Sequence, residues 1–270
     1  EATGGQKNWR LGLACLLRRT GRISAKEPPA AMESTSFLAL SKQVALEMRL
    51  SNIANNLANA STPGYRRNEM AFDGFLSRQH AAAPIVYPVE RGLRVDLGAG
   101  PAISTGNQLD LSLTGNDRAF FVVARGNETF VTRAGAFQLD ESGRLSTAAG
   151  DAVLGAGGDP IVLPGRSANI TVTSSGAIYE GDELVGELQV VEVAPGSTLD
   201  SRGDSRMVAS STRPAEGFAV KQGVVEQSNV QSILELAKMV QLSRDFEALQ
   251  QIQAAEHSRL TDVIERLPAV

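Results

Sequence analysis

Residues able to carry out catalysis are few in this sequence and are not grouped in known arrangements. The chain has two histidines, His80 and His257, and one cysteine, Cys15. The His-Glu-x-x-His, Cys-x-x-Cys and phosphate-loop patterns do not occur in the sequence. The sequence therefore predicts no enzyme activity, no metal, no cofactor and no small-molecule substrate.

Two short motifs could suggest chemistry, but their contexts argue against it. Gly155-Ala156-Gly157-Gly158 begins like a dinucleotide-binding loop, yet Asp159-Pro160 follows where that loop requires a helix. Asp140-Glu141 stands in a turn signal with its two carboxylates adjacent, whereas paired acid–base catalysis needs them to face each other. We interpret the first motif as a glycine turn between strands and the second as a solvated turn.

The most unusual segment combines asparagines with a turn signal between Ser51 and Tyr65. Asparagine is a poor helix former because its amide competes for neighbouring backbone groups. One asparagine suffices to cap a helix. The other amides, each both donor and acceptor, are suited to bonding an adjoining segment or subunit. The predicted assembly motif consists of Asn52, Ile53, Ala54, Asn55, Asn56, Leu57, Ala58, Asn59, Thr62, Pro63 and Gly64.

Two long segments without glycine or proline, Glu33–Leu57 and Ser228–Arg266, predict helices. In each, apolar residues recur every few positions and form a stripe along one face. The stripe residues expected to mediate helix packing are Phe37, Leu40, Val44, Met48, Ile233, Leu236, Val240, Phe246, Leu249 and Ile252. Stripes this long need a helical partner, either the other helix of this chain in a hairpin or the helices of neighbouring subunits.

The zone between the helices has the pattern of short strands separated by glycine turns. Leu109, Leu111 and Leu113 alternate with polar residues, and Phe120–Val123 is a compact apolar run. Further strands are predicted at 129–139, 144–147, 161–163, 169–173 and 187–193. The expected fold class is α+β, with long N- and C-terminal helices packing as a coiled-coil-like pair and a central antiparallel β domain.

Charge and composition exclude several classes of function. The net charge is −4, which gives no electrostatic basis for nucleic-acid binding, and no apolar run is long enough for a transmembrane helix. Residues 1–31 carry six basic residues against two acidic ones. Their apolar stretch Leu11–Leu17 is short for a signal peptide. We expect this segment to be disordered or non-native, either a natural extension or, as we favour, sequence translated upstream of a start at Met32.

The predicted division of the chain has four parts. They are the basic extension (1–31), the N-terminal helix with the asparagine-rich motif (32–62), the central β-rich domain (63–227) and the C-terminal helix (228–270).

Three strings of this sequence resemble signatures of the flagellar rod and hook family. They are LSNIANNLANASTPGYRR (50–67), TGNQLDLSLTGNDRAFFVV (105–123) and GVVEQSNVQSILELAKMVQLSRDFEALQQIQ (223–253). The resemblance extends over residues 32–267. The STPG ending and the QLSRDFE string look more like the proximal-rod members of that family than its distal-rod or hook members.

This resemblance implies a structural subunit that self-assembles with other flagellar rod subunits, of its own and other kinds, into a helical tube that transmits torque across the periplasm. It also implies a place in the flagellar basal body and passage through the flagellar type III export apparatus without a cleaved signal peptide. Terminal segments in this family are often disordered before assembly. The alternatives are a distal-rod or hook subunit, or an exported binding module with a helical stalk.

Overall fold

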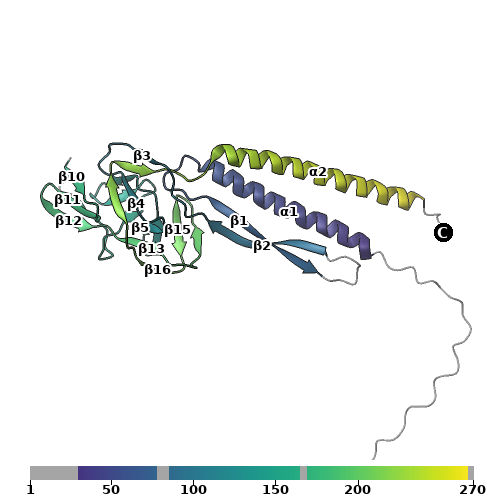
Figure 1. Ribbon diagram of the computed structural model, residues 1–270, viewed down its shortest axis with the longest axis horizontal. Coiled ribbons are helices and arrows are strands. Elements are labelled where there is room, and N and C mark those ends of the chain that lie inside the picture. The colour runs from purple at the N-terminus through teal and green to yellow at the C-terminus, as the bar shows by residue number, and fades with distance from the viewer. Residues whose placement is uncertain (1–29, 78–84, 165–168, 267–270) are drawn as a thin grey trace, which may run out of the picture.

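The computed structural model describes residues 30–77, 85–164 and 169–266. The molecule is elongated, with two long helices at one end and a β domain at the other (Figure 1). Helix α1 (Ala30–Ala58) runs towards the β domain and helix α2 (Ser232–Glu265) runs away from it. The predicted basic extension lies outside the described residues, except for its last two.

Hydrogen bonds mark the end of α1 and the approach to α2. α1 ends in a turn in which the Asn59 N–H donates to the Asn55 carbonyl oxygen (3.2 Å) and the Thr62 N–H donates to the Asn59 carbonyl oxygen (3.1 Å). α2 begins at Ser232, and ahead of it the Ser228 hydroxyl accepts from the Val230 N–H (3.2 Å). Glu235 in the first turn of α2 is favourable to the helix dipole. In the described part of the chain, neither helix carries the apolar length that crossing a membrane requires.

The described residues between the helices form eighteen strands joined by tight turns. The strands are β1 (Asn68–Ser77), β2 (Ile85–Val95), β3 (Ala102–Ser104), β4 (Leu111–Thr114), β5 (Ala119–Arg125), β6 (Glu128–Thr132), β7 (Phe137–Leu139), β8 (Leu145–Thr147), β9 (Ala152–Val153), β10 (Ile170–Val172), β11 (Ala177–Glu180), β12 (Glu183–Glu187), β13 (Val190–Val193), β14 (Leu199–Ser201), β15 (Arg206–Ala209), β16 (Thr212–Pro214), β17 (Ala219–Gln222) and β18 (Val224–Glu226).

The largest sheet has the strand order β14-β15-β6-β5-β9-β8-β7, with β13 pairing both β5 and β16. A second sheet, β10-β11-β12, lies at the end of the molecule farthest from the helices (Figure 1). Two further pairs, β17 with β4 and β18 with β3, carry the chain back across the domain just before α2. Each of these pairings is antiparallel, and together they bring the two helices to the same end of the β domain.

The hairpin β1–β2 leaves the β domain alongside α1 (Figure 1). Its register runs from Asn68↔Val95 to Ser77↔Ile85, with an irregularity between Ala71 and Phe72. These strands were not among those predicted from the sequence. Pro88 and Gly92 lie within the second one, and both residues ordinarily interrupt strands.

Two apolar clusters on opposite faces of β5 form the core of the β domain. Phe121 and Val123 belong to one cluster and Phe120 to the other, as the alternation of side chains along a strand requires. Phe121 meets Phe137 edge to face, with ring centroids 5.2 Å apart. The predicted run Phe120–Val123 is therefore a central strand buried on both faces.

The predicted coiled-coil-like packing of the helices is wrong, and with it the predicted fold class. The helices lie side by side, but the buried residues between them are Leu46, Ile53, Leu242 and Leu249. Val44 and Leu46 differ by about 200° around a helix axis. Burying Leu46 therefore turns the predicted stripe of α1 away from α2, and no coiled-coil pair is formed. The architecture is two helices beside a large antiparallel β domain.

Candidate functional site: the joint between the helices and the β domain

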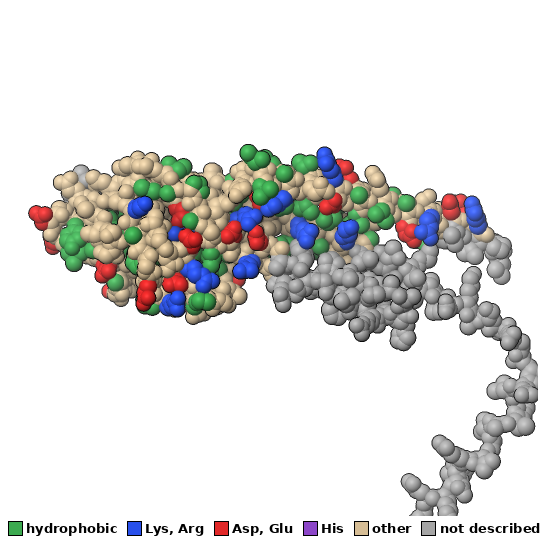
Figure 2. Space-filling view, in the orientation of Figure 1, with side chains coloured by type: hydrophobic (Ala, Val, Ile, Leu, Met, Phe, Trp, Pro, Cys, Tyr) green, Lys and Arg blue, Asp and Glu red, His purple; other side chains and the backbone are tan. Residues whose placement is uncertain are grey.

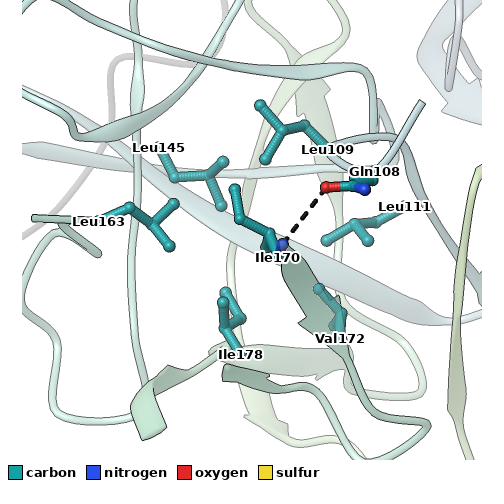
Figure 3. A pocket seen from close by; sticks show the side chains of 8 residues that line it. All are labelled: Gln108, Leu109, Leu111, Leu145, Leu163, Ile170, Val172 and Ile178. Carbon is teal, nitrogen blue, oxygen red and sulfur yellow. Dashed lines mark hydrogen bonds between the residues drawn. The ribbon is translucent and has the colours of Figure 1, made fainter. Parts of the chain in front are cut away.

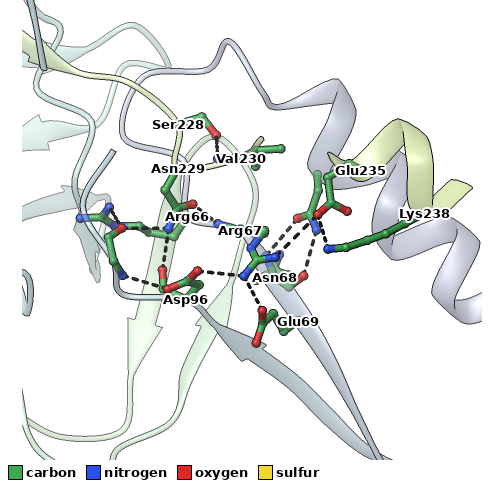
Figure 4. Close-up of polar contacts among 12 residues, drawn as sticks. Arg66, Arg67, Asn68, Glu69, Asp96, Ser228, Asn229, Val230, Glu235 and Lys238 are labelled. Carbon is green, nitrogen blue, oxygen red and sulfur yellow. Dashed lines mark hydrogen bonds and ion pairs between the residues drawn. The ribbon is translucent and has the colours of Figure 1, made fainter. Parts of the chain in front are cut away.

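Polar side chains gather where the helices meet the β domain, in a region that we call the joint (Figure 4). Together with Arg133 of the β domain, three segments build the joint. They are residues 52–69 at the end of α1 and the start of β1, residues 96–100 after β2, and residues 226–238 from β18 into α2. Because these segments are distant in sequence, their mutual bonds fix how the helices leave the β domain.

Asparagine amides attach the end of α1 to the start of β1. The side-chain amides of Asn52 and Asn56 both donate to the Asn68 carbonyl oxygen, each at 2.9 Å. The Asn56 side-chain oxygen accepts from the Asn68 N–H (3.0 Å) and from the Tyr65 hydroxyl (3.2 Å). Asn56 is 1% exposed, and burial raises the pKa of the Tyr65 hydroxyl despite its bond to Asn68. Two of the predicted motif asparagines thus bond a neighbouring segment of the same chain.

The other polar residues of the motif, Asn55, Asn59 and Thr62, bond one another at the end of α1. The Asn59 amide donates to the backbone and side-chain oxygens of Asn55, both at 2.9 Å, and the Thr62 hydroxyl donates to the Asn59 side chain (3.2 Å). Asn55 itself is exposed, with Ala54 and Ala58 exposed beside it. Ile53 is buried against α2, whereas Leu57 is partly buried.

Pro63-Gly64 brings the backbone into direct contact with the β domain. The Gly64 N–H donates to the Glu226 carbonyl oxygen (2.8 Å), and the Ser205 hydroxyl donates to the Pro63 carbonyl oxygen (3.1 Å). Gly64 has φ +66°, and an added Cβ would lie 2.1 Å from the Ala134 nitrogen. Both the backbone conformation and the close approach therefore require glycine.

A carboxylate between two guanidinium groups forms the buried part of the joint. Glu226 pairs with Arg66 (Nη1 to Oε1, 2.8 Å) and with Arg133 (Nε to Oε2, 2.6 Å). The arginine side chains are 1% exposed and that of Glu226 is 4% exposed. Burial lowers the pKa of Arg66, as does Arg133, while Glu226 acts in the opposite direction. Arg133 also donates to the Leu113 carbonyl oxygen (2.8 Å), so its donors serve both the ion pair and the backbone.

Arg67 forms the outer part of the joint, next to α2 (Figure 4). Its guanidinium contacts Glu69, Asp96 (3.1 Å) and Glu235 (3.7 Å). Glu235 is buried and also accepts from Lys238 (2.7 Å). Burial acts to raise the pKa of Asp96, but the Gly98 N–H and the Arg67 guanidinium together hold it below its usual value. The two consecutive arginines thus contact different parts of the molecule, Arg66 the β domain and Arg67 α2.

Asn229 connects all three segments of the joint. Its side-chain oxygen accepts from the Arg67 N–H (2.7 Å), and its amide donates to the carbonyl oxygens of Asp96 (3.1 Å) and Gly98 (2.8 Å). Asn229 lies in the third string that resembles the family signatures, but no partner was predicted for it. Tyr65, Arg66, Arg133 and Glu226 were not singled out from the sequence either. The string YRR (65–67), directly after the predicted motif, was the sequence signal that could have pointed to Tyr65 and Arg66.

Most of the residues predicted to mediate helix packing do not face the other helix. Leu249 is buried and Phe246 partly buried against α1. For Phe37, the structure describes the backbone in α1 and not the side chain. The others are exposed; they are Leu40, Val44, Met48, Ile233, Leu236, Val240 and Ile252.

The described residues surround a very small cavity and a larger open hollow. A cavity of about 10 Å³ lies among aliphatic side chains such as Leu111 and Ile178, with Gln108 at its edge (Figure 3). It is barely the size of one water molecule. An open hollow of about 570 Å³ lies beside Phe130 and Arg206. The Arg206 guanidinium forms an ion pair with Asp204 (3.0 Å). In the described part of the chain, no group of three or more metal-binding side chains is found.

Three protein-family models match the chain. Residues 40–66 match the flagella basal body rod protein model, and residues 115–180 match the flagellar hook protein FlgE/F/G D1 domain. Residues 221–264 match the flagellar basal body rod FlgEFG protein C-terminal model. The three matches follow the order α1, β domain, α2. They place the chain in the class of flagellar rod and hook proteins.

Identities to individual relatives narrow this class to one family of rod proteins. The chain is 34% identical to the flagellar basal-body rod protein FlgF of Mesorhizobium japonicum, over 80% of this chain and 90% of that protein. It is 30% identical to FlgF of Caulobacter vibrioides, over 87% and 98%. Identity to the rod protein FlgG of Bacillus subtilis is 27%, over 81% and 93%. The chain therefore belongs to the FlgF family of flagellar basal-body rod proteins, which are structural proteins and not enzymes.

Replacing Gly64 by alanine should destabilise the protein beyond the cost of its backbone conformation. Gly126 provides the matched control, since it has φ +62° but no atom within 4 Å of an added Cβ. We expect Gly126→Ala to lower the free energy of unfolding by about 1–2 kcal/mol. Gly64→Ala should cost roughly 2 kcal/mol more, because the backbone at Ala134 must move. Urea unfolding measures the free energy of unfolding of both variants. Equal losses would contradict the close approach of Gly64 to the Ala134 backbone.

Replacing Glu226 by glutamine should destabilise the joint because it leaves two buried guanidinium groups without the carboxylate that pairs with them. We expect the free energy of unfolding to fall by about 3–5 kcal/mol. Glu256→Gln removes a pair (2.8 Å) with the largely exposed Arg259 and should cost less than about 1 kcal/mol. The same urea titration compares them. A cost for Glu226→Gln no larger than the control would mean that the buried pair is not formed.

Proposed function

We propose that this chain is a proximal-rod subunit of the flagellar basal body that self-assembles through its two helices. The observation that carries this proposal is the apolar surface that both helices present away from each other. In α1, Leu40, Val44 and Met48 are 55%, 40% and 37% exposed and follow one another at four-residue spacing. In α2, Ile233, Leu236 and Val240 are 86%, 47% and 52% exposed.

Apolar side chains gather on the visible face of the helical part (Figure 2). Each large apolar side chain gains about 1.5–3 kcal/mol when it is moved from water into a packed contact. A neighbouring helix supplies such a contact along the whole length of a stripe. These residues, chosen from the sequence as packing positions, are therefore proposed as contacts between subunits rather than within one.

The stripes of α1 and α2 are different surfaces, which favours an open assembly. Contact between one stripe and the other on the next subunit is heterologous, and a heterologous contact that does not close produces a helical filament. A rod requires this kind of repeated contact. The proximal-rod assignment is supported by identities of 30–34% to FlgF proteins against 27% to FlgG of Bacillus subtilis.

The asparagine-rich segment contributes to assembly in two ways under this proposal. Asn52 and Asn56 hold the joint within the subunit, since both donate to Asn68. Asn55, with exposed Ala54 and Ala58 on its two sides, offers an amide at a surface of small side chains. Asn55 is therefore the motif asparagine proposed to meet an adjoining subunit.

The proposed partners are further copies of this chain and other rod subunits. The proposed location is the periplasm-spanning rod, reached through the flagellar type III export apparatus without a cleaved signal peptide. The names of the relatives, flagellar basal-body rod proteins, support the basal-body location. The predicted boundaries at residues 62 and 227 separate the assembling helices from the β domain in this proposal.

Polar substitutions in the α1 stripe should block rod assembly and leave the isolated subunit intact. In the double variant Leu40→Gln with Val44→Gln, each change should alter the free energy of unfolding by no more than about 0.5 kcal/mol, because both side chains are exposed. A flagellated host lacking its own copy of the gene should not swim with this variant. The control double variant, Leu184→Gln with Val162→Gln, changes exposed apolar residues of the β domain and should support swimming. Normal swimming with the α1 variant would contradict the proposal.

Single alanine substitutions should separate the two asparagine roles. Asn56→Ala removes a buried amide and should lower the free energy of unfolding by about 1–3 kcal/mol. Asn55→Ala should leave stability within about 0.5 kcal/mol yet reduce swimming in soft agar. Urea unfolding and the swimming assay measure the pair. Full motility with Asn55→Ala would remove Asn55 from the proposed contact.

A further inference from the structure

The buried guanidinium of Arg66 bonds through one of its three nitrogens. Its Nη1 donates to the Gly98 carbonyl oxygen and pairs with the Glu226 carboxylate (2.8 Å). Its Nε and Nη2 are also buried, and in the described part of the chain neither has a hydrogen-bond partner. A buried donor that is left unpaired costs free energy. An acceptor beside these two nitrogens would therefore stabilise the folded chain.

Arg133, on the other side of Glu226, uses all of its guanidinium nitrogens. Its Nε pairs with Glu226 (2.6 Å), its Nη1 donates to the Asn116 carbonyl oxygen (3.1 Å), and its Nη2 donates to that of Leu113 (2.8 Å). The chain thus supplies every acceptor around one arginine of the joint and only part of those around the other.

The acceptors nearest to Arg66 already serve other donors. The Oε1 atom of Glu226 accepts from the Gly100 N–H (2.9 Å) as well as pairing with Arg66, and its Oε2 pairs with Arg133. The Gly98 carbonyl oxygen also accepts from the Asn229 amide (2.8 Å). These oxygens hold Nη1 and leave the edge formed by Nε and Nη2 open.

The buried charges at this point do not balance. Arg66 and Arg133 carry two positive charges against the one negative charge of Glu226, and all three side chains are at most 4% exposed. Burial lowers the pKa of Arg66 most, Glu226 opposes this change, and Arg133 adds to it, so that the pKa stays below its usual value. A further negative charge beside Arg66 would offset both burial and the repulsion from Arg133.

Two carboxylates nearer the surface act on Arg66 without bonding its open edge. Asp117 favours the charged form of Arg66, and Arg66 helps to lower the pKa of Asp96. Asp117 is exposed and the Asp96 side chain is 35% exposed, so solvent screens both charges. The buried guanidinium groups therefore keep an excess of positive charge.

We propose that Nε and Nη2 of Arg66 bind a small monovalent anion, which is chloride in ordinary buffers. This edge of a guanidinium presents two parallel N–H donors, the arrangement with which arginine holds anions. A monatomic ion suits nitrogens that lie this far below the surface. An ordered water at the same place would accept both hydrogen bonds but leave the charge unbalanced. Because Arg66 follows α1 and Glu226 precedes α2, the anion stabilises the joint and is released when the chain unfolds.

Urea unfolding of the purified full-length chain tests this site when chloride replaces gluconate at constant ionic strength. If one ion is released on unfolding, the unfolding equilibrium constant should fall about tenfold for each tenfold rise in chloride above the dissociation constant. An unfolding equilibrium constant that is the same in chloride and in gluconate would overturn the proposal.

Arg66→Lys separates binding at this edge from general effects of salt. Lysine keeps a positive charge beside Glu226 but lacks the paired N–H groups of a guanidinium. The chloride dependence should be lost in Arg66→Lys. It should be retained in the control Arg259→Lys, whose arginine side chain is 74% exposed. An equal chloride dependence in the two variants and the unchanged chain would overturn the proposal.

Bromide locates the ion in the unchanged chain, so this measurement stands even if Arg66→Lys does not fold. Crystals of the full-length chain grown in bromide should show an anomalous-scattering peak within hydrogen-bond distance of Arg66 Nε and Nη2. Peaks at surface arginines only, or an ordered water in place of the ion, would overturn the proposal. These experiments involve no assembly, so a failure of the proposed rod contacts would leave their results unchanged.

Discussion

The carboxylate of Glu226 is the contact on which the rest of the joint depends. It stands at the end of β18, directly before the turn into α2, and it neutralises one arginine from each side of the joint. Arg66 follows the end of α1, whereas Arg133 belongs to the β domain. The Glu226 backbone oxygen also accepts from the Gly64 N–H, where Gly64 lies close to the backbone of Ala134. A buried ion pair contributes little net stability compared with apolar packing, but it is favourable only in one relative arrangement of its groups. We therefore read Glu226 as fixing direction more than adding stability.

Much of the element order could be predicted from the sequence, because glycine, proline and apolar spacing act locally. The two segments without glycine or proline are α1 and α2, and Phe120–Val123 is a buried strand. The predicted strand 129–139 is divided into β6 and β7. Between them, Gly135 lies so close to Leu111 that an added Cβ would be 1.7 Å from its carbonyl oxygen. A close approach between distant segments leaves no periodic signal in either of them.

The faces of the helices were harder to predict than the helices themselves. Apolar residues occupy more than one side of α1, with Val44 and Met48 on one side and Leu46 and Ile53 on another. Periodicity shows that apolar faces exist, yet it does not show which of them meets α2 and which stays open. The same limit applied to the joint. The asparagine motif stood out by composition, but its main partners, Asn68 and Tyr65, are ordinary residues that the chain turn brings into reach.

The division between a polar joint and apolar helix surfaces fits what the proposed assembly requires of a subunit. Apolar side chains that are buried within one subunit cannot contact a neighbouring subunit. The stripes must therefore remain exposed in the single chain. The joint has the opposite requirement, because its direction must be set before the neighbour arrives. Hydrogen bonds and ion pairs suit this task, since they are satisfied in pairs and in one geometry. Because the bonds of Asn56, Asn229 and Glu226 are completed within the chain, the angle between the helices and the β domain is a property of the subunit. In the proposed assembly, every copy repeats that angle.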